Sequence, residues 1–398
     1  MEIVKNNIID NIENILTINT HSHHFKENFF VDFDLNRLLM DSYVNWSGVQ
    51  FSDTHESREK YLQKVRYKSY FIWLQKSLKH LYNISENLSA DNWDEYSVRI
   101  NEAHKQKDWH KSILTNNCNY KKIILDAYWA PGSNNGDSQL FAPTFRIDPL
   151  FFGFDKNTLD HDKNNVYQLY KKEFDDIDSY ENFVRELIIS QISKGNVALK
   201  NAIAYDRGID YIKVSKEKAN QVFMKNGQTK KNIKLFQDYI FSVICELASE
   251  LNVPIQCHAG SGCLNRTNSI NMIEIIKMHT KTKFVLFHGG FPWADDLVGL
   301  LHAFSNVYVD LCWLPILSPS AAQNLLHQVI EIGTTEKICW GCDTWTSEES
   351  FGAKLAMNYV LEKVLYSKIV DNYLSTDDAI HIAENILYFN PKELYKIT

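Results

Sequence analysis

The sequence predicts an α/β protein of the (β/α)₈ TIM-like barrel class with a helical insertion after its first strand. Eight short apolar runs typical of buried strands occur along the chain, and most are followed by a stretch with helical periodicity. Between residues 25 and 121 this alternation is absent. The length of 398 residues suits one barrel with an insertion. We therefore expect a single domain over residues 1–398, in which residues 25–121 form a helical cap.

The expected strands are short and apolar, as in a parallel sheet that helices cover. The first strand begins near Ile15 and ends at the paired histidines His21 and His23. The others are expected at 122–127, 141–147, 197–204, 253–257, 283–287, 307–311 and 337–340. A doubly wound open sheet is the alternative, but no Gly-x-Gly-x-x-Gly sequence follows the first strand.

Periodicity and capping residues place the helices. One helix, over 3–14, precedes the first strand, and the insertion contains a long helix over 61–82 and another over 93–104. A helix over 179–192 is expected to begin at Ser179 as its cap, and the last helix, over 376–387, begins after Ser375. Further helices are expected at 216–224, 230–251, 270–278, 293–304, 321–332 and 349–365.

Composition and charge argue against several classes of function. The chain is 44% hydrophobic and 23% charged, as in globular proteins with a large core. A net charge of −7 without a long basic block argues against nucleic-acid binding. No apolar run is long enough for a bilayer, and no signal peptide is visible. We expect a cytoplasmic enzyme for a small molecule, without nucleic-acid or membrane partners and able to form homo-oligomers.

The seven cysteines match no zinc-finger spacing. Cys339 and Cys342 form a Cys-x-x-Cys pair that permits redox chemistry, but Cys339 lies within an expected strand and no thioredoxin-like context surrounds it. We expect reduced thiols, with Cys339 buried beside Trp340.

Polar side chains mark the ends of several expected strands. His21 and His23 are two residues apart, so on a strand they share one face. His258, His288 and Asp343 follow the fifth, sixth and eighth strands. Active sites of barrels lie at the carboxyl ends of the strands, and histidine with carboxylate suits zinc or a similar divalent metal. Each histidine alone has an ordinary explanation as a buried residue bonded to backbone, and Asp343 alone as a helix cap. The set in barrel order predicts a metal site.

Lys200 lies inside the fourth apolar run. A buried lysine is costly unless its charge is paired or chemically altered. It is therefore a further candidate for the site.

Six short motifs along the chain carry a family resemblance. They are Thr20–His23, Leu199–Tyr205, Pro254–Gly260, Phe287–Pro292, Asn306–Asp310 and Asn385–Leu387 followed by Asn390. In this order the motifs resemble the amidohydrolase superfamily, specifically its amidohydrolase-related branch, which also contains metal-dependent decarboxylases. They are most similar to the amidohydrolase-like domains fused to glutamine synthetase.

The resemblance implies a role for each site residue. His21, His23 and Asp343 would bind the more buried metal, and Asp343 would also take a proton from the attacking water. Lys200 would be carboxylated and bridge two metals. His258 and His288 would hold the second ion.

The decarboxylase branch implies a different arrangement. There a single metal is held by the paired histidines, by His258 and by Asp343, and His288 acts as an acid–base group. Lys200 favours the version with two metals. Zinc is the expected metal, with one or two ions per chain.

Candidate substrate contacts lie just beyond the strands. Arg146, Arg207 and Arg266 each suit bidentate binding of a carboxylate, although each alone is as readily a structural ion pair. Tyr205 and Trp313 are candidates to line the pocket, with core packing as their alternative.

The function expected from these residues is metal-dependent hydrolysis of a C–N (amide-like) or ester bond in a small, carboxylated substrate. The metal would lower the pKa of the attacking water, and Asp343 would act as general base and later as acid. A non-oxidative decarboxylase on the same scaffold is the alternative reaction. A non-catalytic binding module is the alternative from another class, and the full ligand set argues against it.

Overall fold

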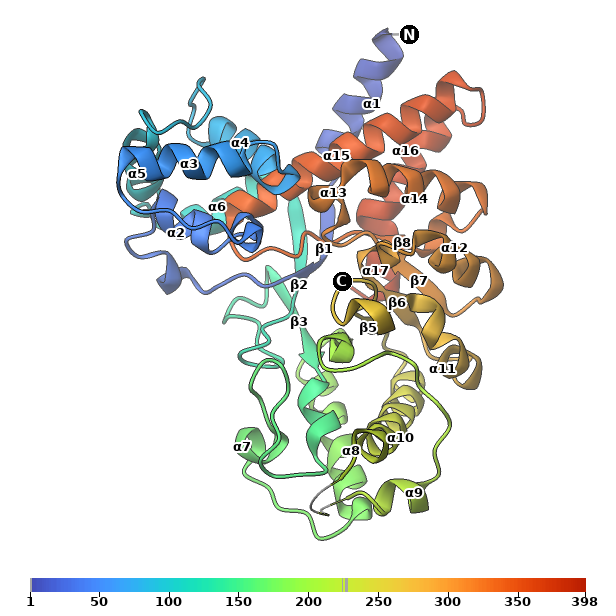
Figure 1. Cartoon of the computed structure of the whole chain (residues 1–398). Helices are drawn as coiled ribbons and strands as arrows, with labels where there is room; N and C mark the ends of the chain where they lie inside the picture. Colours follow the sequence, from blue (N-terminus) through green and yellow to red (C-terminus); the bar gives the residue numbers. More distant parts are fainter. Residues whose placement is uncertain (1, 224, 226–227) are drawn as a thin grey trace. The chain divides into compact units, whose positions relative to one another are not determined.

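The computed structural model describes residues 2–223, 225 and 228–398 and contains one eight-stranded sheet (Figure 1). Neighbouring strands in the sheet follow the order of the chain from β1 to β8, and β3 to β8 pair in parallel. This is a TIM-like barrel, as predicted. The strands are β1 (Thr17–Ser22), β2 (Tyr120–Leu125), β3 (Phe141–Arg146), β4 (Ala198–Asn201), β5 (Ile255–Cys257), β6 (Phe284–Leu286), β7 (Val307–Asp310) and β8 (Ile338–Cys339).

All eight expected strands are present, and most are shorter than the apolar runs that predicted them. The run over 197–204 illustrates the reason. β4 ends at Asn201, because Ile203–Tyr205 turns into a 3₁₀ helix although it is still apolar. An apolar run in the sequence indicates that residues are buried. Residues remain buried beyond the last hydrogen bond between the strands, so the run is longer than the strand.

The chain divides into two compact units, and each is described by itself. The first unit comprises residues 1–123, 312–327 and 340–388, and the second comprises 124–311, 328–339 and 389–398. The expectation of one domain over the whole chain stays a prediction.

In the first unit, helices fill the segment between β1 and β2. Here one prediction is wrong, because the expected single helix over 61–82 is two helices. Lys68 adopts an extended conformation and ends the helical run between them. The two helices then turn separate apolar faces into one core that includes Tyr61 and Leu74. The helices are α2 (Leu35–Met40), α3 (His55–Val65), α4 (Ser69–Leu81), α5 (Trp93–His104) and α6 (Trp109–Ser112).

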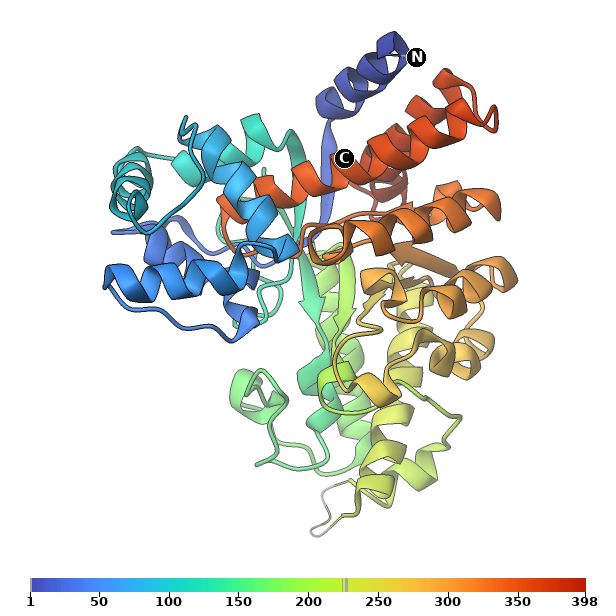
Figure 2. The same cartoon turned by 45° about the horizontal axis from the view of Figure 1, so that its top comes forward.

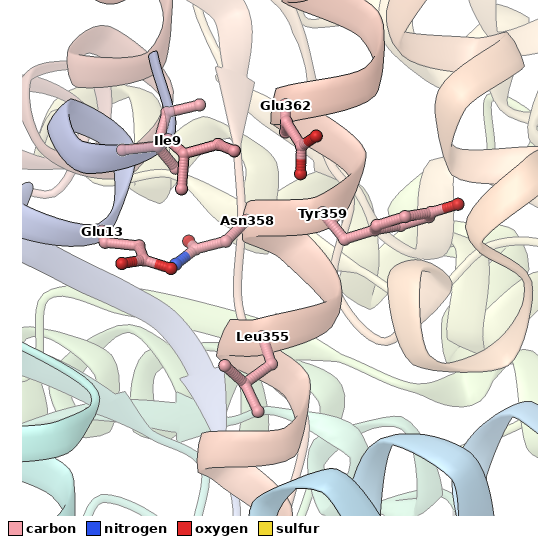
Figure 3. A pocket seen from close by; sticks show the side chains of 7 residues that line it. Ile9, Glu13, Leu355, Asn358, Tyr359 and Glu362 are labelled. Carbon is pink, nitrogen blue, oxygen red and sulfur yellow. The ribbon is translucent and has the colours of Figure 1, made fainter. Parts of the chain in front are cut away.

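The longest helix of the first unit is α15 (Ser347–Val370), and it packs against α4 and α1 (Glu2–Asn14) (Figure 2). A cavity of about 110 Å³ lies between α1 and α15 (Figure 3). Its described lining is mostly apolar or carboxylate and contains no histidine or cysteine, so it is no candidate for the metal chemistry. α13 (Leu314–Leu317) and α16 (Thr376–Glu384) complete this unit, and Ser375 caps α16 as predicted.

In the second unit, helices follow the strands as expected. Ser179 is not the cap of α8, which is a wrong prediction: Asp176 is the N-cap, and Ser179 is the third helical residue of the same capping box. The expected helix over 216–224 ends at Asn220, and Met224 lies outside the described residues. The helices are α7 (Val166–Tyr170), α8 (Ile177–Ser193), α9 (Lys216–Asn220), α10 (Lys230–Glu250), α11 (Ile273–Met278), α12 (Ala294–Ala303) and α17 (Asn390–Leu394). α14 (Pro319–Glu331) belongs in part to each unit.

In the part of the chain that is described, no helix has the length and apolar character needed to cross a membrane.

Candidate metal centre

The backbone of β1 pairs with the segment that follows β8. The N–H of Asp343 donates to the carbonyl oxygen of His21 at 2.9 Å, and the N–H of His23 donates to the carbonyl oxygen of Thr344, also at 2.9 Å. These two hydrogen bonds hold the segment after β8 beside the end of β1, so that Asp343 lies next to His21 and His23. The beginning and the end of the barrel sequence thus meet at the candidate site.

The side chains of His21, His23 and Asp343 converge. The Nε2 atom of His21 lies 3.3 Å from Oδ1 of Asp343, and that of His23 lies 3.1 Å from the same oxygen. All three residues are buried. Two imidazole nitrogens and one carboxylate oxygen close together are a donor set for a borderline divalent metal such as zinc. The residues therefore fit the metal that the sequence predicts.

The charge of Asp343 is stabilised inside the protein. Burial acts against its charged form, but hydrogen bonds and charge from His21 and His23 hold the pKa of the carboxyl well below its usual range. The residue is therefore ionised at neutral pH, as a metal ligand must be. Its backbone lies in the left-handed region with φ of 62°, which for a non-glycine residue is a conformation frequent at functional sites.

Gly341 allows the two backbone segments to approach. A Cβ atom placed on this glycine would lie 2.5 Å from the backbone nitrogen of His21 and 2.9 Å from its Cβ. A side chain at this position would push β1 away and shift the first histidine. The glycine is needed for space.

His24 lies outside the group formed by His21, His23 and Asp343. It is buried, and its ring centroid is 5.3 Å from that of His110. Burial lowers the pKa of His24 to about 3, so it is neutral.

Glu349, in the first turn of α15, is a second carboxylate near Asp343. Its side chain is 5% exposed, and Oε1 accepts the backbone N–H of Tyr43 at 2.6 Å. Burial and then the charge of Asp343 raise the pKa of Glu349 to about 8, against the opposing effect of hydrogen bonds from the backbone of Tyr43 and of Trp345. Oε2 is buried, and among the described residues it has no hydrogen-bond partner.

Tyr43 also belongs to a cluster of four aromatic residues, which we call the aromatic wall: Tyr43, Tyr70, Trp313 and Trp345. Trp345 stacks on His23 with ring centroids 5.4 Å apart and an interplanar angle of 29°. The ring of Tyr43 lies 5.0 Å from Trp345, 5.3 Å from Tyr70 and 6.0 Å from Trp313. The wall therefore begins at a candidate metal ligand and continues into the helical insertion.

The second unit holds the other predicted ligands. The Nε2 atom of His288 lies 3.0 Å from Nδ1 of His258, and both side chains are buried. Nε2 of His258 also lies 2.5 Å from the carbonyl oxygen of Ser261. Lys200 is 2% exposed, and its Nζ lies 3.7 Å from the ring centroid of Phe287. The structure thus brings His258 and His288 together and places the buried Lys200 amine over the ring of Phe287, while their role in metal binding stays a prediction.

Arg146 is part of a buried ion-pair cluster. Its guanidinium contacts Asp126 at 2.7 Å, Asp162 at 2.6 Å and Asp148 at 3.6 Å. These carboxylates raise the pKa of Arg146 although burial opposes its charge. Its predicted contact with a substrate carboxylate stays a prediction, and such a carboxylate would compete with three resident ones.

Tyr205 lies between two histidines of the second unit. Its ring centroid is 4.5 Å from that of His258 and 4.9 Å from that of His161, and the tyrosine is 41% exposed. His161 in turn contacts Asp206 at 2.7 Å. Tyr205 is thus a surface aromatic beside a candidate ligand, which suits the predicted lining role.

Arg207 and Arg266 line one cavity of about 400 Å³ in the second unit. Arg207 pairs with the buried Asp238 at 2.7 Å and donates to the carbonyl oxygen of Gly208 at 2.7 Å. Arg266 is exposed at the rim. Both arginines, each predicted to bind a substrate carboxylate, therefore line the same cavity. Arg207 already pairs with the carboxylate of Asp238.

The sequence interpretation missed Glu349 and Tyr43. Glu349 reads as an ordinary acidic residue in a helical first turn, and Tyr43 lies in the insertion, 306 positions from its hydrogen-bond partner. It also missed the acidic partners of Arg146. The predicted burial of Cys339 is confirmed; Cys342 is buried as well, and burial raises the pKa of both thiols.

Comparisons with known proteins agree with the fold. The family model described as Amidohydrolase matches residues 236–397, and no curated protein sequence matches the chain. A uronate isomerase from Thermotoga maritima has a TM-score of 0.78 at 15% identity over 98% of this chain and 97% of that one. A glucuronate isomerase from Caulobacter crescentus has a TM-score of 0.76 at 14% identity over 99% and 94%. A protein described as a metal-dependent hydrolase from Lactobacillus casei ATCC 334 has a TM-score of 0.70 at 16% identity over 98% and 97%.

The structural similarities confirm the TIM-like barrel. The family match supports the amidohydrolase resemblance over residues 236–397. The finer likeness to domains fused to glutamine synthetase stays a prediction.

Proposed function

We propose that the chain is a metal-dependent enzyme of the amidohydrolase superfamily that hydrolyses a C–N (amide-like) or ester bond of a small, carboxylated substrate. One observation carries the proposal: the Nε2 atoms of His21 and His23 both lie within 3.3 Å of the same Asp343 oxygen. The match of the Amidohydrolase family model to residues 236–397, which include Asp343, supports it.

His21, His23 and Asp343 would hold the metal. A bound divalent metal supplies a lowered pKa for the attacking water and polarises the scissile carbonyl. Asp343 then accepts the proton of that water at its carboxylate, because the low pKa keeps the group ionised before the reaction. The same carboxyl returns the proton to the leaving group. Trp345, stacked on His23, holds the ring of that ligand in place and excludes water from one side.

His288 is proposed as a second acid–base group, and His258 and Lys200 as further members of the centre. Support comes from the hydrogen bond between the two imidazoles, which orients the ring of His288, and from burial of all three side chains. The number of metal ions and the carboxylation of Lys200 are tested below.

The test measures metal content and hydrolysis together. The purified protein is analysed for bound metals by mass spectrometry, stripped with dipicolinate, reloaded with zinc, cobalt or manganese, and assayed against N-acyl amino acids and lactones. H23N should lose the metal and the activity. H24N changes the neighbouring histidine outside the donor set and should retain both. Retention of metal and activity by H23N would refute the proposed centre.

An isomerase acting on a sugar acid is a second candidate, favoured by the barrel similarity to two uronate-type isomerases. The two reactions differ in their use of water, because hydrolysis consumes a water molecule and isomerisation does not. Incubation with D-glucuronate, followed by proton NMR, would detect a keto sugar acid. A keto product without hydrolysis of any amide or lactone would favour the isomerase.

A non-oxidative decarboxylase is the remaining alternative. Release of carbon dioxide from an aromatic or unsaturated acid, without net addition of water, would identify it. Homo-oligomer formation also stays a prediction, which light scattering of the purified protein tests.

A further inference from the structure

The cavity of about 400 Å³ in the second unit has the size of a small-molecule site. Its lining comes from the segments that follow β3, β4 and β5 and from the first two turns of α10. In barrels, the segments that follow the strands carry the ligand-binding residues. Four cationic and two anionic side chains line the cavity. What it could bind depends on which of these charges are already paired.

Arg207 is held by the protein on several sides. Its Nη1 lies 2.7 Å from Oδ1 of Asp238 and 3.4 Å from Oε1 of Gln237, and its Nε donates to the carbonyl oxygen of Gly208 at 2.7 Å. Nη2 is buried and lies 3.9 Å from Oδ1 of Asp210. Arg207 therefore contributes a fixed positive charge to the cavity wall, without a free edge for bidentate binding of a carboxylate.

Lys234 is paired as well. Its Nζ contacts Oδ2 of Asp238 at 2.6 Å and Oδ2 of Asp210 at 3.6 Å, and it donates to the carbonyl oxygen of Asp210. Asp206, the other anionic residue of the lining, contacts Nδ1 of His161 at 2.7 Å. Each carboxylate at the cavity thus already lies beside a cation or a histidine.

Lys230 and Arg266 are the cations that remain. Both residues are exposed, and within the described part of the chain neither side chain forms an ion pair. The position of Arg266 is fixed by its backbone, because its carbonyl oxygen accepts the N–H of Ile209 at 3.2 Å. Gly208 permits this approach, since a Cβ atom there would lie 2.9 Å from that of Arg266. Two unpaired cations thus line one cavity.

The start of α10 adds to the positive charge. Its first turn, all of it described, carries Lys230 and Lys231 and no acidic residue. The positive end of the helix dipole lies in this turn, where acidic residues are favourable and lysines are not. The repulsion would be relieved by an anion bound in the cavity.

The rest of the lining is apolar. Phe152 and Phe154 are 6% and 4% exposed, and Ile233 of α10 lies between the two lysines of the cavity in sequence. Apolar surface beside a few charged groups is typical of sites for small organic molecules. The ligand that fits this lining has an anionic end and a carbon body.

The number of unpaired cations indicates which anion. A carboxylate carries one negative charge and would neutralise only one of Lys230 and Arg266. A phosphoryl group carries nearly two charges and presents three acceptor oxygens in different directions. It can therefore engage a lysine and an arginine that come from different elements.

We propose that this cavity binds a small organic phosphate, whose phosphoryl group contacts Lys230 and Arg266 and whose carbon body lies against Phe152, Phe154 and Ile233. Within the described lining there is no residue that is proposed to hold the metal. The inference therefore goes beyond the proposed function and does not depend on it.

The experiment uses phenylphosphonate, whose C–P bond resists hydrolysis. It is titrated calorimetrically into the full-length protein, beside methylphosphonate, benzoate and benzyl alcohol. Phenylphosphonate should bind about tenfold or more tightly than benzoate, because it engages a second cation. It should exceed methylphosphonate by a similar factor, because methylphosphonate has almost no apolar body to bury. Benzyl alcohol should not bind, and added salt should weaken the binding of both phosphonates.

Variants assign the binding to this cavity. K230M and R266M each remove one unpaired charge from an exposed position, and each should lower the affinity for phenylphosphonate about tenfold. K231M is the matched control, because Lys231 is exposed in the same turn of α10 but does not line the cavity. It should bind phenylphosphonate within about twofold of the wild type.

Three results would overturn the inference. Benzoate that binds as tightly as phenylphosphonate would remove the preference for a phosphoryl group. Unchanged affinity in both K230M and R266M would place the binding outside the cavity. Absence of phenylphosphonate binding to the wild type would leave the cavity without the proposed ligand.

Removal of metal separates this inference from the proposed function. The titration is repeated after stripping with dipicolinate and dialysis. Binding that persists without metal and weakens in K230M supports the cavity, whatever the metal centre does. Binding that disappears with the metal would assign the probe to the metal centre, which overturns this inference and leaves the proposed function intact.

Discussion

The N–H of Asp343 donates to the carbonyl oxygen of His21 at 2.9 Å, and the Asp343 carboxylate lies 3.3 Å from the Nε2 atom of the same histidine. One pair of residues is thus joined twice, through backbone and through side chain, across 322 positions of sequence. The donor set is therefore as rigid as the pairing of β1 with the segment after β8. Any change that separates these segments should weaken metal binding before it unfolds the protein.

Replacement of Gly341 tests this coupling. In G341A the new Cβ would meet the backbone of His21 at 2.5 Å, so β1 must move and carry the histidine with it. We expect metal affinity to fall at least about tenfold and the free energy of unfolding to fall by about 1–3 kcal/mol, the usual range for overpacking. Metal competition with a chromogenic chelator measures the affinity. G299A is the matched control, because Gly299 lies in α12 with no atom near its Cβ position. Unchanged metal affinity in G341A would contradict the coupling.

The chemical state of Lys200 distinguishes a site with one metal ion from a site with two. If it is carboxylated, K200A should lower the metal content from two ions per chain to one and reduce hydrolysis, and formate or acetate should restore part of the activity, because a small carboxylate replaces the lost oxygen ligand. If it is unmodified, its ammonium stays over the ring of Phe287, and K200A leaves the metal content as it was. Metal analysis of wild type and variant, with and without acetate, distinguishes the two states.

The fold could be predicted from the sequence because burial leaves a pattern. The eight apolar runs were all strands, and the paired histidines at the end of the first run lie where a barrel places its site. The break between α3 and α4 could not be predicted in this way. The apolar pattern continues across Lys68, although the backbone there is extended.

The site was predictable only where its residues lie at strand ends. His21, His23 and Asp343 follow that rule, and their side chains converge. Glu349 does not follow it: its hydrogen-bond partner Tyr43 comes from the helical insertion, where no strand end marks the position. Arg146 shows the converse. It lies at the end of β3 as a substrate residue would, yet its partners are carboxylates brought together only by folding.

Glu348, the neighbour of Glu349, is expected to be structural. It is fully buried and contacts Tyr82 and His104 at 2.6 Å. Burial opposes its charge, but His104 and Tyr82 lower its pKa to about 2, from 4.5. Its contribution to stability is therefore present above pH 4.5 and lost as the pH falls towards 2.

E348Q should accordingly lower the free energy of unfolding at pH 7 by about 3 kcal/mol, because it leaves a buried partner unpaired. Urea denaturation measures the loss, which should shrink as the solution is acidified. E102Q removes an exposed charge that pairs with Lys105 and should change stability by less than about 1 kcal/mol. An E348Q protein as stable as the wild type at pH 7 would show that the buried contacts contribute little.

Lys354 of α15 is expected to make stability depend on pH in the alkaline range. It is 2% exposed, its Nζ donates to Oγ1 of Thr17 in β1 at 3.0 Å, and burial lowers its pKa from 10.5 to about 7. Between these two pH values the unfolded chain binds a proton that the folded protein does not. Stability from this group therefore rises with pH from about 7 to 10.5.

In K354M the apolar side chain has similar length and carries no charge to desolvate. We expect the variant to be more stable than the wild type at pH 7 by about 1–3 kcal/mol, and this difference should narrow as the pH rises. Urea denaturation across the range measures it. K363M on the same helix removes a lysine whose side chain is 43% exposed and should leave the pH dependence as in the wild type. A K354M protein that loses stability at pH 7 would show that the hydrogen bond to Thr17 outweighs the cost of burying the amine.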